Sequence, residues 1–323
     1  MAKALILGVN GQDGSYLAEL LIRKGTEVIG WVPSNIPIST LNISHILEEI
    51  KLVKGNLKDV DSIRESVDVH KPDEIYNLAS PSSPYASWQS SLEVSDVTGL
   101  GAARILEVIR NYCPQTRFYQ ASSSEIFGNP EGEPQNEETP FRPRNPYGIA
   151  KLFAHCMTML YREKFGLYAV SGILYNHESP RRGLDFVTRK ITHTAAKIKL
   201  GFEKELRLGN LEARRDWGYA KDYTKAIWLM MHQNKPEDYV IGSGETHSVR
   251  EFCELAFGLL ELDYRDFVVC DDRFFRPLEA KQMVADISKA ANNLNWEPKT
   301  NFKTLVKLMV EADLEFAASQ QRQ

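Results

Sequence analysis

The chain has 323 residues, enough to bury a large core in two domains or in one extended domain. Its 43% hydrophobic and 25% charged content indicates a folded globular protein. The sequence contains no run of 18 apolar residues, so it predicts no membrane span. The net charge of -4 argues against a general nucleic-acid partner, and four scattered cysteines argue against a metal or redox site. The first apolar run follows no basic leader, so we expect a cytoplasmic protein.

Through the first half of the chain, short apolar runs alternate with amphipathic stretches of helix length. Strands connected by helices favour a parallel sheet with helices on both faces, where ligands bind outside the carboxyl ends of the strands. We therefore predict an α/β fold with a Rossmann-like, doubly wound parallel sheet. The expected strands cover 3–8, 27–31, 51–55, 73–79, 117–122 and 168–174, and the expected helices cover 12–24, 59–68, 96–111 and 147–165.

This alternation loosens from about residue 176, where Arg, Lys and His become frequent and a helix expected at 248–261 mixes with short strands. The change predicts a second, smaller α/β lobe that binds the substrate. We expect a dinucleotide-binding domain over 1–175, with return segments near 213–245, and a substrate lobe formed mainly by 176–323. The sequence has no internal repeat or long linker, so the lobes are expected to pack tightly around a cleft.

A glycine-rich turn, GVNGQDG, lies between the first expected strand and the first expected helix. Gly8, Gly11 and Gly14 are three residues apart, and their missing Cβ atoms would let the backbone approach a pyrophosphate. The free N–H groups at the helix start would then bind this anion. The glycines can also serve only a tight turn, but their position in the first βα unit favours a dinucleotide site.

The end of the second strand should distinguish the dinucleotides, because an acid there binds the ribose of NAD and an arginine binds the 2′-phosphate of NADP. The residues at this point are Trp31, Val32, Pro33 and Ser34. Since neither signature is present, the cofactor is predicted to be NADP or NAD.

Two segments carry the candidate catalytic group, FYQASSSEIFG at 118–128 and NPYGIAK at 145–151. Tyr147 and Lys151 are four residues apart and share one helix face. A lysine ammonium and the positive ring of the cofactor would lower the pKa of the tyrosine, which could then remove a hydroxyl proton during hydride transfer. On spacing alone such a pair is more often a solvated helix surface, but the serine run at a strand end supports the catalytic interpretation.

Two side chains of that serine-rich segment add to the chemistry. Ser123 could hydrogen-bond the reacting hydroxyl, and Glu125 could remove a proton from carbon. Oxidation of an alcohol does not need the second step, so Glu125 indicates elimination. The alternative role for Glu125 is to cap a neighbouring helix.

The sequence around these motifs resembles a known family. The glycine turn and the Ser, Tyr, Lys set are similar to those of the extended short-chain dehydrogenases/reductases, and longer segments resemble the GDP-mannose 4,6-dehydratase family within them, nearly from end to end. The resemblance implies dehydration of GDP-mannose, or of a closely related GDP-sugar, to the 4-keto-6-deoxy sugar. The segments are GQDGSYLAELL, YQASSSEIFG, GILYNHESPRRG, FVTRKIT, LGNLEARRDWGYAKDY and FFRPLE.

The same resemblance implies roles for individual residues. Tyr147 and Lys151 would oxidise C4 beside Ser123, which stands where the family usually has threonine. Glu125 would remove the C5 proton, water would leave C6, and the hydride would return to C6. The implied cofactor-binding residues are Gly8, Gly11, Gln12, Asp13, Gly14, Asn56, Leu57, Leu78, Ala79, Ser80, Tyr147 and Lys151. The implied substrate-binding residues are Asn176, Glu178, Ser179, Arg182, Lys190, Asn210, Arg215, Arg276 and Glu279.

The chain departs from the family pattern in three places. WVPSNIPISTLN replaces a loop whose paired arginines bind the NADP 2′-phosphate and support a tetramer, and SPSSPYASW replaces residues that approach the sugar. The segment before FFRP is also shorter than the family pattern. Another GDP-linked hexose or a heptose is therefore an alternative substrate. The resemblance implies a homodimer, through the helices expected at 96–111 and 147–165, or a homotetramer.

Two other functions fit parts of the same set. A GDP-sugar C4 dehydrogenase, reductase or 4-epimerase would use the Ser, Tyr, Lys residues with no mechanistic need for Glu125. A silent dinucleotide-binding sensor or scaffold would need none of the catalytic residues, and the intact set argues against it.

Overall fold

The computed structural model describes residues 1–34, 37, 39–274 and 283–320. Its centre is a seven-stranded parallel sheet with the strand order β11-β6-β5-β4-β1-β2-β3. Strands are added outward on both sides of the β1–β4 pair, so the predicted Rossmann-like, doubly wound fold is confirmed. The strands are β1 (Lys3–Leu7), β2 (Glu27–Pro33), β3 (Ile50–Gly55), β4 (Glu74–Asn77), β5 (Arg117–Ala121), β6 (Ala169–Leu174) and β11 (Tyr239–Ile241).

The burial of these strands follows from their place in the sheet. The inner strand β6 is buried at every residue, as expected when helices cover both faces. The edge strand β3 instead exposes Lys51 and Lys54, and charged side chains on an edge oppose pairing with another chain.

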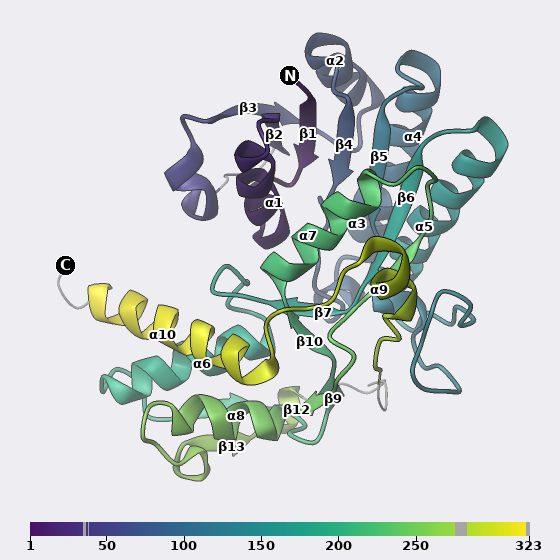
Figure 1. The fold of residues 1–323 in the computed structure, drawn as a ribbon. Helices are drawn as coiled ribbons and strands as arrows, with labels where there is room; N and C mark the ends of the chain where they lie inside the picture. Colours follow the sequence, from purple (N-terminus) through teal and green to yellow (C-terminus); the bar gives the residue numbers. More distant parts are fainter. Residues whose placement is uncertain (35–36, 38, 275–282, 321–323) are drawn as a thin grey trace.

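Helices cover the sheet on its two faces (Figure 1). One face packs against α1 (Gln12–Arg23), α7 (Ala220–Met231) and α9 (Ser288–Leu294), in a core that also contains Trp296. The other face packs against α2 (Val60–His70), α4 (Gly101–Tyr112) and α5 (Pro146–Phe165). The first core therefore takes helices from the second half of the chain as well as from the first.

The helix expected at 96–111 differs from the prediction. A short α-helix, α3 (Ser91–Val94), leads into a π-helical turn at Ser95–Leu100, and regular α-helix begins only with α4 at Gly101. Gly99 and Gly101 interrupt the apolar pattern and weaken regular helix, because glycine loses more backbone entropy than other residues.

A second lobe lies below the sheet in Figure 1. Its core is formed by α6 (Val187–Lys199), α8 (Val249–Gly258) and α10 (Phe302–Gln320). Three two-stranded ladders complete it, and they pair β7 (Asn176–Glu178) with β10 (Trp217–Tyr219), β8 (Leu206–Leu208) with β13 (Val268–Cys270), and β9 (Arg214–Arg215) with β12 (His247–Ser248). Short 3₁₀ turns lie at Leu41–Ile46, Ala86–Trp88, Ser124–Ile126, Tyr264–Asp266 and Asp272–Phe274. Among the described helices, none combines the length and apolarity needed to cross a membrane.

Candidate active site

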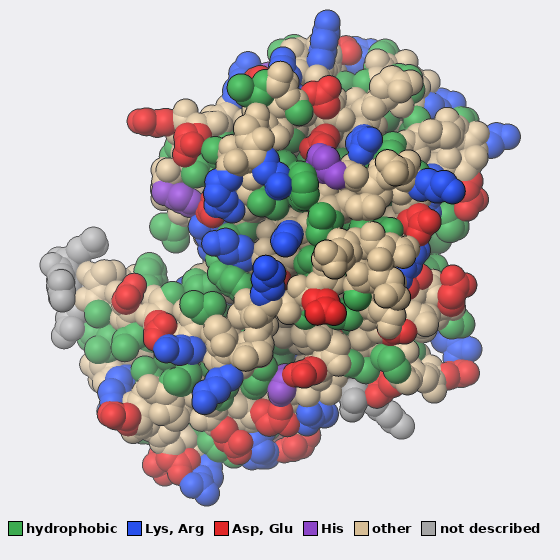
Figure 2. Space-filling view, in the orientation of Figure 1, with side chains coloured by type: hydrophobic (Ala, Val, Ile, Leu, Met, Phe, Trp, Pro, Cys, Tyr) green, Lys and Arg blue, Asp and Glu red, His purple; other side chains and the backbone are tan. Residues whose placement is uncertain are grey.

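Two adjoining cavities lie at the carboxyl ends of the sheet strands. The larger, about 500 Å³, extends from the end of β5 to the second lobe, and the smaller, about 480 Å³, lies over the glycine turn. They share Asp13, Leu78, Ser80, Arg182 and Asp185 in their walls, so they form one continuous cleft. The space-filling view shows a notch between the sheet domain and the second lobe, beside the C-terminal helix (Figure 2). Acidic and basic side chains both lie around this notch.

The glycine turn can only close without side chains. Gly8 has a φ of +85°, and a Cβ on Gly14 would lie 2.2 Å from the Gly8 carbonyl oxygen. Helix α1 starts from Gly11 without a side-chain cap, and its first residues line the smaller cavity. The first N–H groups of a helix lack partners within the helix, so this wall suits a diphosphate.

Tyr147 and Lys151 lie in the first two turns of α5, which begins at an Asn-Pro sequence. The Asn145 side chain accepts a hydrogen bond from Gly148 N at 2.8 Å, and Pro146 occupies the first turn, where its missing N–H has no consequence. Both functional side chains are buried and line the larger cavity. The Lys151 Nζ donates to the Ala121 carbonyl at 2.8 Å and lies 5.6 Å from the centre of the Tyr147 ring.

The lowered tyrosine pKa was expected with the cofactor's positive ring in place, and without that ring burial dominates. Burial raises the pKa of Tyr147 to about 12, although a hydrogen bond with Ser123 opposes the rise. Burial also lowers the pKa of Lys151 to about 8, with a smaller opposite effect from Asp13. The sequence could show that the two side chains share a helix face, but it could not show how much water both lose.

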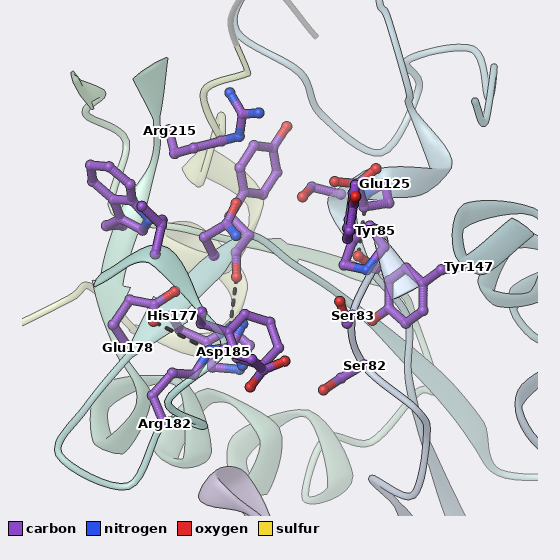
Figure 3. Close-up of a pocket in the computed structure, with 18 of the residues that line it drawn as sticks. Ser82, Ser83, Tyr85, Glu125, Tyr147, His177, Glu178, Arg182, Asp185 and Arg215 are labelled. Atoms are coloured by element: carbon purple, nitrogen blue, oxygen red, sulfur yellow. Dashed lines mark hydrogen bonds and ion pairs between the residues drawn. The ribbon is translucent and has the colours of Figure 1, made fainter. Parts of the chain in front are cut away.

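Glu125 lines the same cavity as this pair, in the 3₁₀ turn Ser124–Ile126 that follows β5. Asn145 Nδ2 donates to Glu125 Oε2 at 2.7 Å, so one residue both caps α5 and orients the carboxylate. A Cβ on Gly148 would lie 2.7 Å from the Glu125 carbonyl oxygen, which explains the glycine in the helix. Figure 3 shows Glu125, Tyr85, Ser83 and Tyr147 along one wall of the cavity. We call this side the strand-end wall.

The opposite side, which we call the lobe wall, carries the charged residues of the second lobe. Figure 3 shows Glu178, Arg182, Asp185 and Arg215 there. The Glu178 carboxylate is buried, accepts a hydrogen bond from Thr188 Oγ1 at 2.5 Å, and lies 3.2 Å from Arg182 Nε. Asn176, Lys190 and Asn210 line the same cavity.

The remaining predicted residues lie elsewhere. Ser179 is fully buried outside the cavity walls, and its hydroxyl donates to Gln12 Oε1 at 2.8 Å. Leu57 is in the sheet core, and neither Asn56 nor Ala79 lines either cavity, although the Ala79 backbone lies 3.1 Å from the Cβ position of Gly8. Gln12 and Gly14 line the smaller cavity. Arg276 and Glu279 lie outside the described residues.

The cleft also contains residues that the sequence analysis did not select. Tyr85, Ser82 and Ser83 come from the SPSSPYASW loop, His177 lies between two predicted residues, and Asp185 follows them. Asn145 could have been found, because an asparagine before proline at a helix start is a capping signal. Among the described residues, no group of three or more His, Cys, Asp or Glu side chains is arranged to hold a metal ion.

Two solved structures with the same architecture are described as enzymes of nucleotide-linked sugars. The UDP-glucose 4-epimerase of Thermotoga maritima superposes with a TM-score of 0.87 at 22% identity, over 97% of this chain and 99% of that chain. A dTDP-glucose 4,6-dehydratase of Bacillus anthracis, in complex with NAD, superposes with a TM-score of 0.84 at 22% identity, over 97% and 96%. These likenesses define the fold as that of epimerases and dehydratases.

Sequence comparison narrows this class to one family. The model of the family described as GDP-mannose 4,6 dehydratase matches residues 5–309. GDP-mannose 4,6 dehydratase 1 of Arabidopsis thaliana is 47% identical over 97% of this chain and 90% of its own length, and the human GDP-mannose 4,6 dehydratase is 43% identical over 97% and 91%. The GDP-mannose 4,6-dehydratase of Vibrio cholerae is 41% identical over 98% and 94%. The chain belongs to the GDP-mannose 4,6-dehydratase family.

Proposed function

We propose that this protein dehydrates GDP-mannose, or a closely related GDP-sugar, to the 4-keto-6-deoxy sugar. The observation that carries the proposal is the carboxylate of Glu125 in the same cavity as Tyr147 and Lys151. A 4,6-elimination needs one base for a hydroxyl and a second for a carbon, and this wall supplies both. Membership of the family supports the same reaction.

The cofactor of this reaction is NADP or NAD, and the smaller cavity fits it. The uncapped start of α1 and the glycine turn suit its diphosphate, and Lys151 and Tyr147 line the larger cavity, which adjoins the smaller one. When bound, the nicotinamide supplies a hydride acceptor for C4, a hydride donor for C6 and a positive charge. We assign cofactor binding to residues 1–175 with the return segments near 213–245, and GDP-sugar binding mainly to 176–323.

Tyr147 removes the proton of the C4 hydroxyl in this proposal. Ser123, which hydrogen-bonds Tyr147, stabilises the phenolate as it forms. The Lys151 ammonium adds a positive charge beside the ring and is itself held by the Ala121 carbonyl. These two contacts, together with the charge of the oxidised nicotinamide, oppose the burial that otherwise keeps the tyrosine protonated.

Glu125 performs the step that separates a dehydratase from an alcohol dehydrogenase. Once C4 is a ketone, the proton on C5 becomes acidic, and the Glu125 carboxylate removes it and passes a proton to the departing C6 hydroxyl, which leaves as water. The hydrogen bond from Asn145 keeps the carboxylate turned into the cavity. The lobe wall binds the GDP group, for which Arg182, Lys190 and Arg215 provide cations.

The test is to follow GDP-mannose by mass with the purified protein, without added cofactor and then with NAD or NADP. We expect loss of one water with no net reduction of the cofactor, and no loss of water with Glu125→Gln. Accumulation of reduced cofactor would favour a C4 dehydrogenase instead. Recovery of an isomer of the same mass would favour a 4-epimerase. If GDP-mannose is not converted but a different GDP-sugar binds, that GDP-sugar would become the proposed substrate.

We further propose a cytoplasmic homodimer that uses the outer faces of α3, the π-helical turn and α5. Ile149, Phe153 and Leu160 lie on α5 and are about half exposed, and Leu92 on α3 is 86% exposed. Apolar side chains gathered on neighbouring helices are typical of protein interfaces. Size-exclusion chromatography with light scattering should give a dimer or tetramer, and Phe153→Asp should give a monomer. A wild-type monomer would refute the proposal.

A further inference from the structure

An ion pair joins the two lobes inside the cleft, and the proposed reaction uses neither partner in a chemical step. Asp13 lies in the first turn of α1 and lines both cavities, and His177 is the central residue of β7. Asp13 Oδ2 and His177 Nε2 are 2.9 Å apart, and the side chains are 23% and 11% exposed. The contact spans 164 positions of the sequence.

The partners of the imidazole determine its charge. His177 Nδ1 lies 2.7 Å from the Tyr175 carbonyl oxygen, which can only accept a hydrogen bond. Nε2 faces a carboxylate, which when ionised also only accepts. With Asp13 ionised, both nitrogens must carry hydrogen, and the ring is then an imidazolium.

The shifts of both pKa values agree with this geometry. Burial favours neutral groups, yet the attraction of Asp13 outweighs it and raises the pKa of His177. Against the same burial penalty, His177, Arg182 and Gln12 hold the pKa of Asp13 below its ordinary value. Among the charged groups of the described residues, Asp13 and Arg182 act most on His177.

Further bonds connect the same two segments. Gln12 Nε2 donates to the His177 carbonyl at 3.0 Å, and Ser179 Oγ donates to Gln12 Oε1 at 2.8 Å. Arg181 Nη1 donates to Ser15 Oγ at 3.0 Å. The first turn of α1 therefore holds the segment from His177 to Arg181 along its length.

This arrangement has an electrostatic consequence for the smaller cavity. A carboxylate at the start of α1 lies where the helix otherwise attracts an anion, and an unpaired Asp13 would repel a diphosphate there. The imidazolium cancels that charge. On either side of His177, Asn176 and Glu178 line the larger cavity, so the same residue that neutralises Asp13 also positions the sugar-nucleotide wall.

We propose that Asp13 and His177 are a positioning pair that couples the cofactor site to the GDP-sugar site. A dinucleotide bound at the start of α1 fixes the position of Asp13. Asp13 in turn fixes His177, and His177 fixes its neighbours Asn176 and Glu178 in β7. Each ligand therefore binds more tightly when the other is present, since coupling between two sites is reciprocal. The coupling rests on the proposed function for the identity of its two ligands.

The experiment measures equilibrium binding and needs no turnover. GDP and oxidised cofactor are titrated calorimetrically into the full-length protein, each alone and each in the presence of the other. In the wild type, we expect either ligand to lower the dissociation constant of the other by about tenfold. In His177→Gln, the uncompensated Asp13 should weaken cofactor binding by about tenfold and bring the coupling ratio near one.

Two further variants separate charge from position. The double variant Asp13→Asn/His177→Gln is neutral again, so it should recover cofactor affinity while the coupling stays lost. Glu19→Gln is the matched control, because it removes another ion pair between α1 and the same segment, with Arg181, at a residue that lines neither cavity. This control should keep the wild-type coupling ratio.

A wild-type coupling ratio and cofactor affinity in a folded His177→Gln protein would overturn the proposal. If that variant does not fold, the nearly isosteric Asp13→Asn replaces it, and an unchanged ratio there would also overturn it. Failure of the proposed dehydration would look different. The protein would then bind both ligands and show their coupling without releasing water from GDP-mannose.

Discussion

The two walls of the cleft position their side chains in different ways. On the strand-end wall, Lys151 is fixed by a backbone carbonyl and Glu125 by the residue that caps α5, and these contacts need not change when substrate binds. On the lobe wall, Arg182 is paired with Glu178 and Lys190 Nζ donates to the Arg207 carbonyl at 2.6 Å. The fold thus orients the reacting groups before substrate binds. The cations of the lobe wall are instead bonded to other protein groups, and a phosphate must displace those contacts when it binds.

The strongest test of this difference is removal of the phenol from the strand-end wall. Tyr147→Phe should lower kcat by about 10³-fold, the usual range for loss of a general base, with little change in the dissociation constant of GDP. Steady-state kinetics and calorimetry give the two values. A kcat within tenfold of the wild type would remove Tyr147 from the proposed mechanism.

On the lobe wall, Arg215→Met should have the opposite signature. We expect KM for the GDP-sugar to rise by roughly tenfold or more, since a charge-assisted contact contributes about 1.5–3 kcal/mol, while kcat stays within a few-fold. The same kinetic assay applies, with Arg207→Met as a control on an exposed cation of this lobe that lines neither cavity. An equal fall in kcat would show that the lobe wall also acts on the transition state.

Removing the buried ammonium should stabilise the fold while it destroys activity. The pKa of Lys151 is lowered from 10.5 to about 8, so below pH 8 the folded protein bears the penalty of a buried charge. At pH 7, Lys151→Met should raise the free energy of unfolding by on the order of 2 kcal/mol and Tm by a few degrees. This advantage should shrink as pH rises from 8 towards 10.5, because the cost of deprotonating Lys151 on folding falls steadily and vanishes only when the lysine of the unfolded chain is neutral too. The measurement is thermal unfolding of both proteins across that pH range. A difference in Tm between Lys151→Met and the wild type that does not change with pH would contradict the interpretation.

The smallest effect is expected at the cap of α5. Asn145→Ala should lower the free energy of unfolding by about 1 kcal/mol, the usual value of an N-cap, and should lower kcat a few-fold because Glu125 loses its donor. Asn145→Asp retains the cap but not the donor. It should therefore retain the stability of the cap and show a fall in kcat of at least a few-fold, and loss of stability as well would mean that the two functions of Asn145 are inseparable.

The sequence predicted the sheet well because local patterns determine it. Each strand from β1 to β6 is an apolar run bounded by turn residues, and the helix after it has a period of 3.6, so order and direction follow from general rules of connection. The fourth strand was predicted at 73–79 and is shorter, at Glu74–Asn77, because the chain turns into the cleft at Leu78. The short ladders of the second lobe have no such pattern, so short strands were expected there but their two- and three-residue positions were not predicted.

The cleft was less predictable, because most of its contacts join distant segments. Tyr147 and Lys151 are four residues apart and could be recognised, whereas no local pattern brings His177 to Asp13. Ser179 was selected as a substrate residue, but its hydroxyl is used inside the protein, which a sequence motif cannot distinguish. The effect of burial on the pKa of Tyr147 was missed for the same reason, since it depends on every residue that surrounds the ring.

The core around α7, β11 and α9 also matters for synthesis of the chain. One face of the sheet is completed by Met230, Ile241 and Trp296, which a ribosome adds long after the first six strands have emerged. Until then, α1 covers only part of this apolar face, and the remainder stays exposed on the nascent chain. An N-terminal half cut at residue 175 would leave exposed the part of that face which α7 and α9 cover, so we expect this half to aggregate when it is made alone.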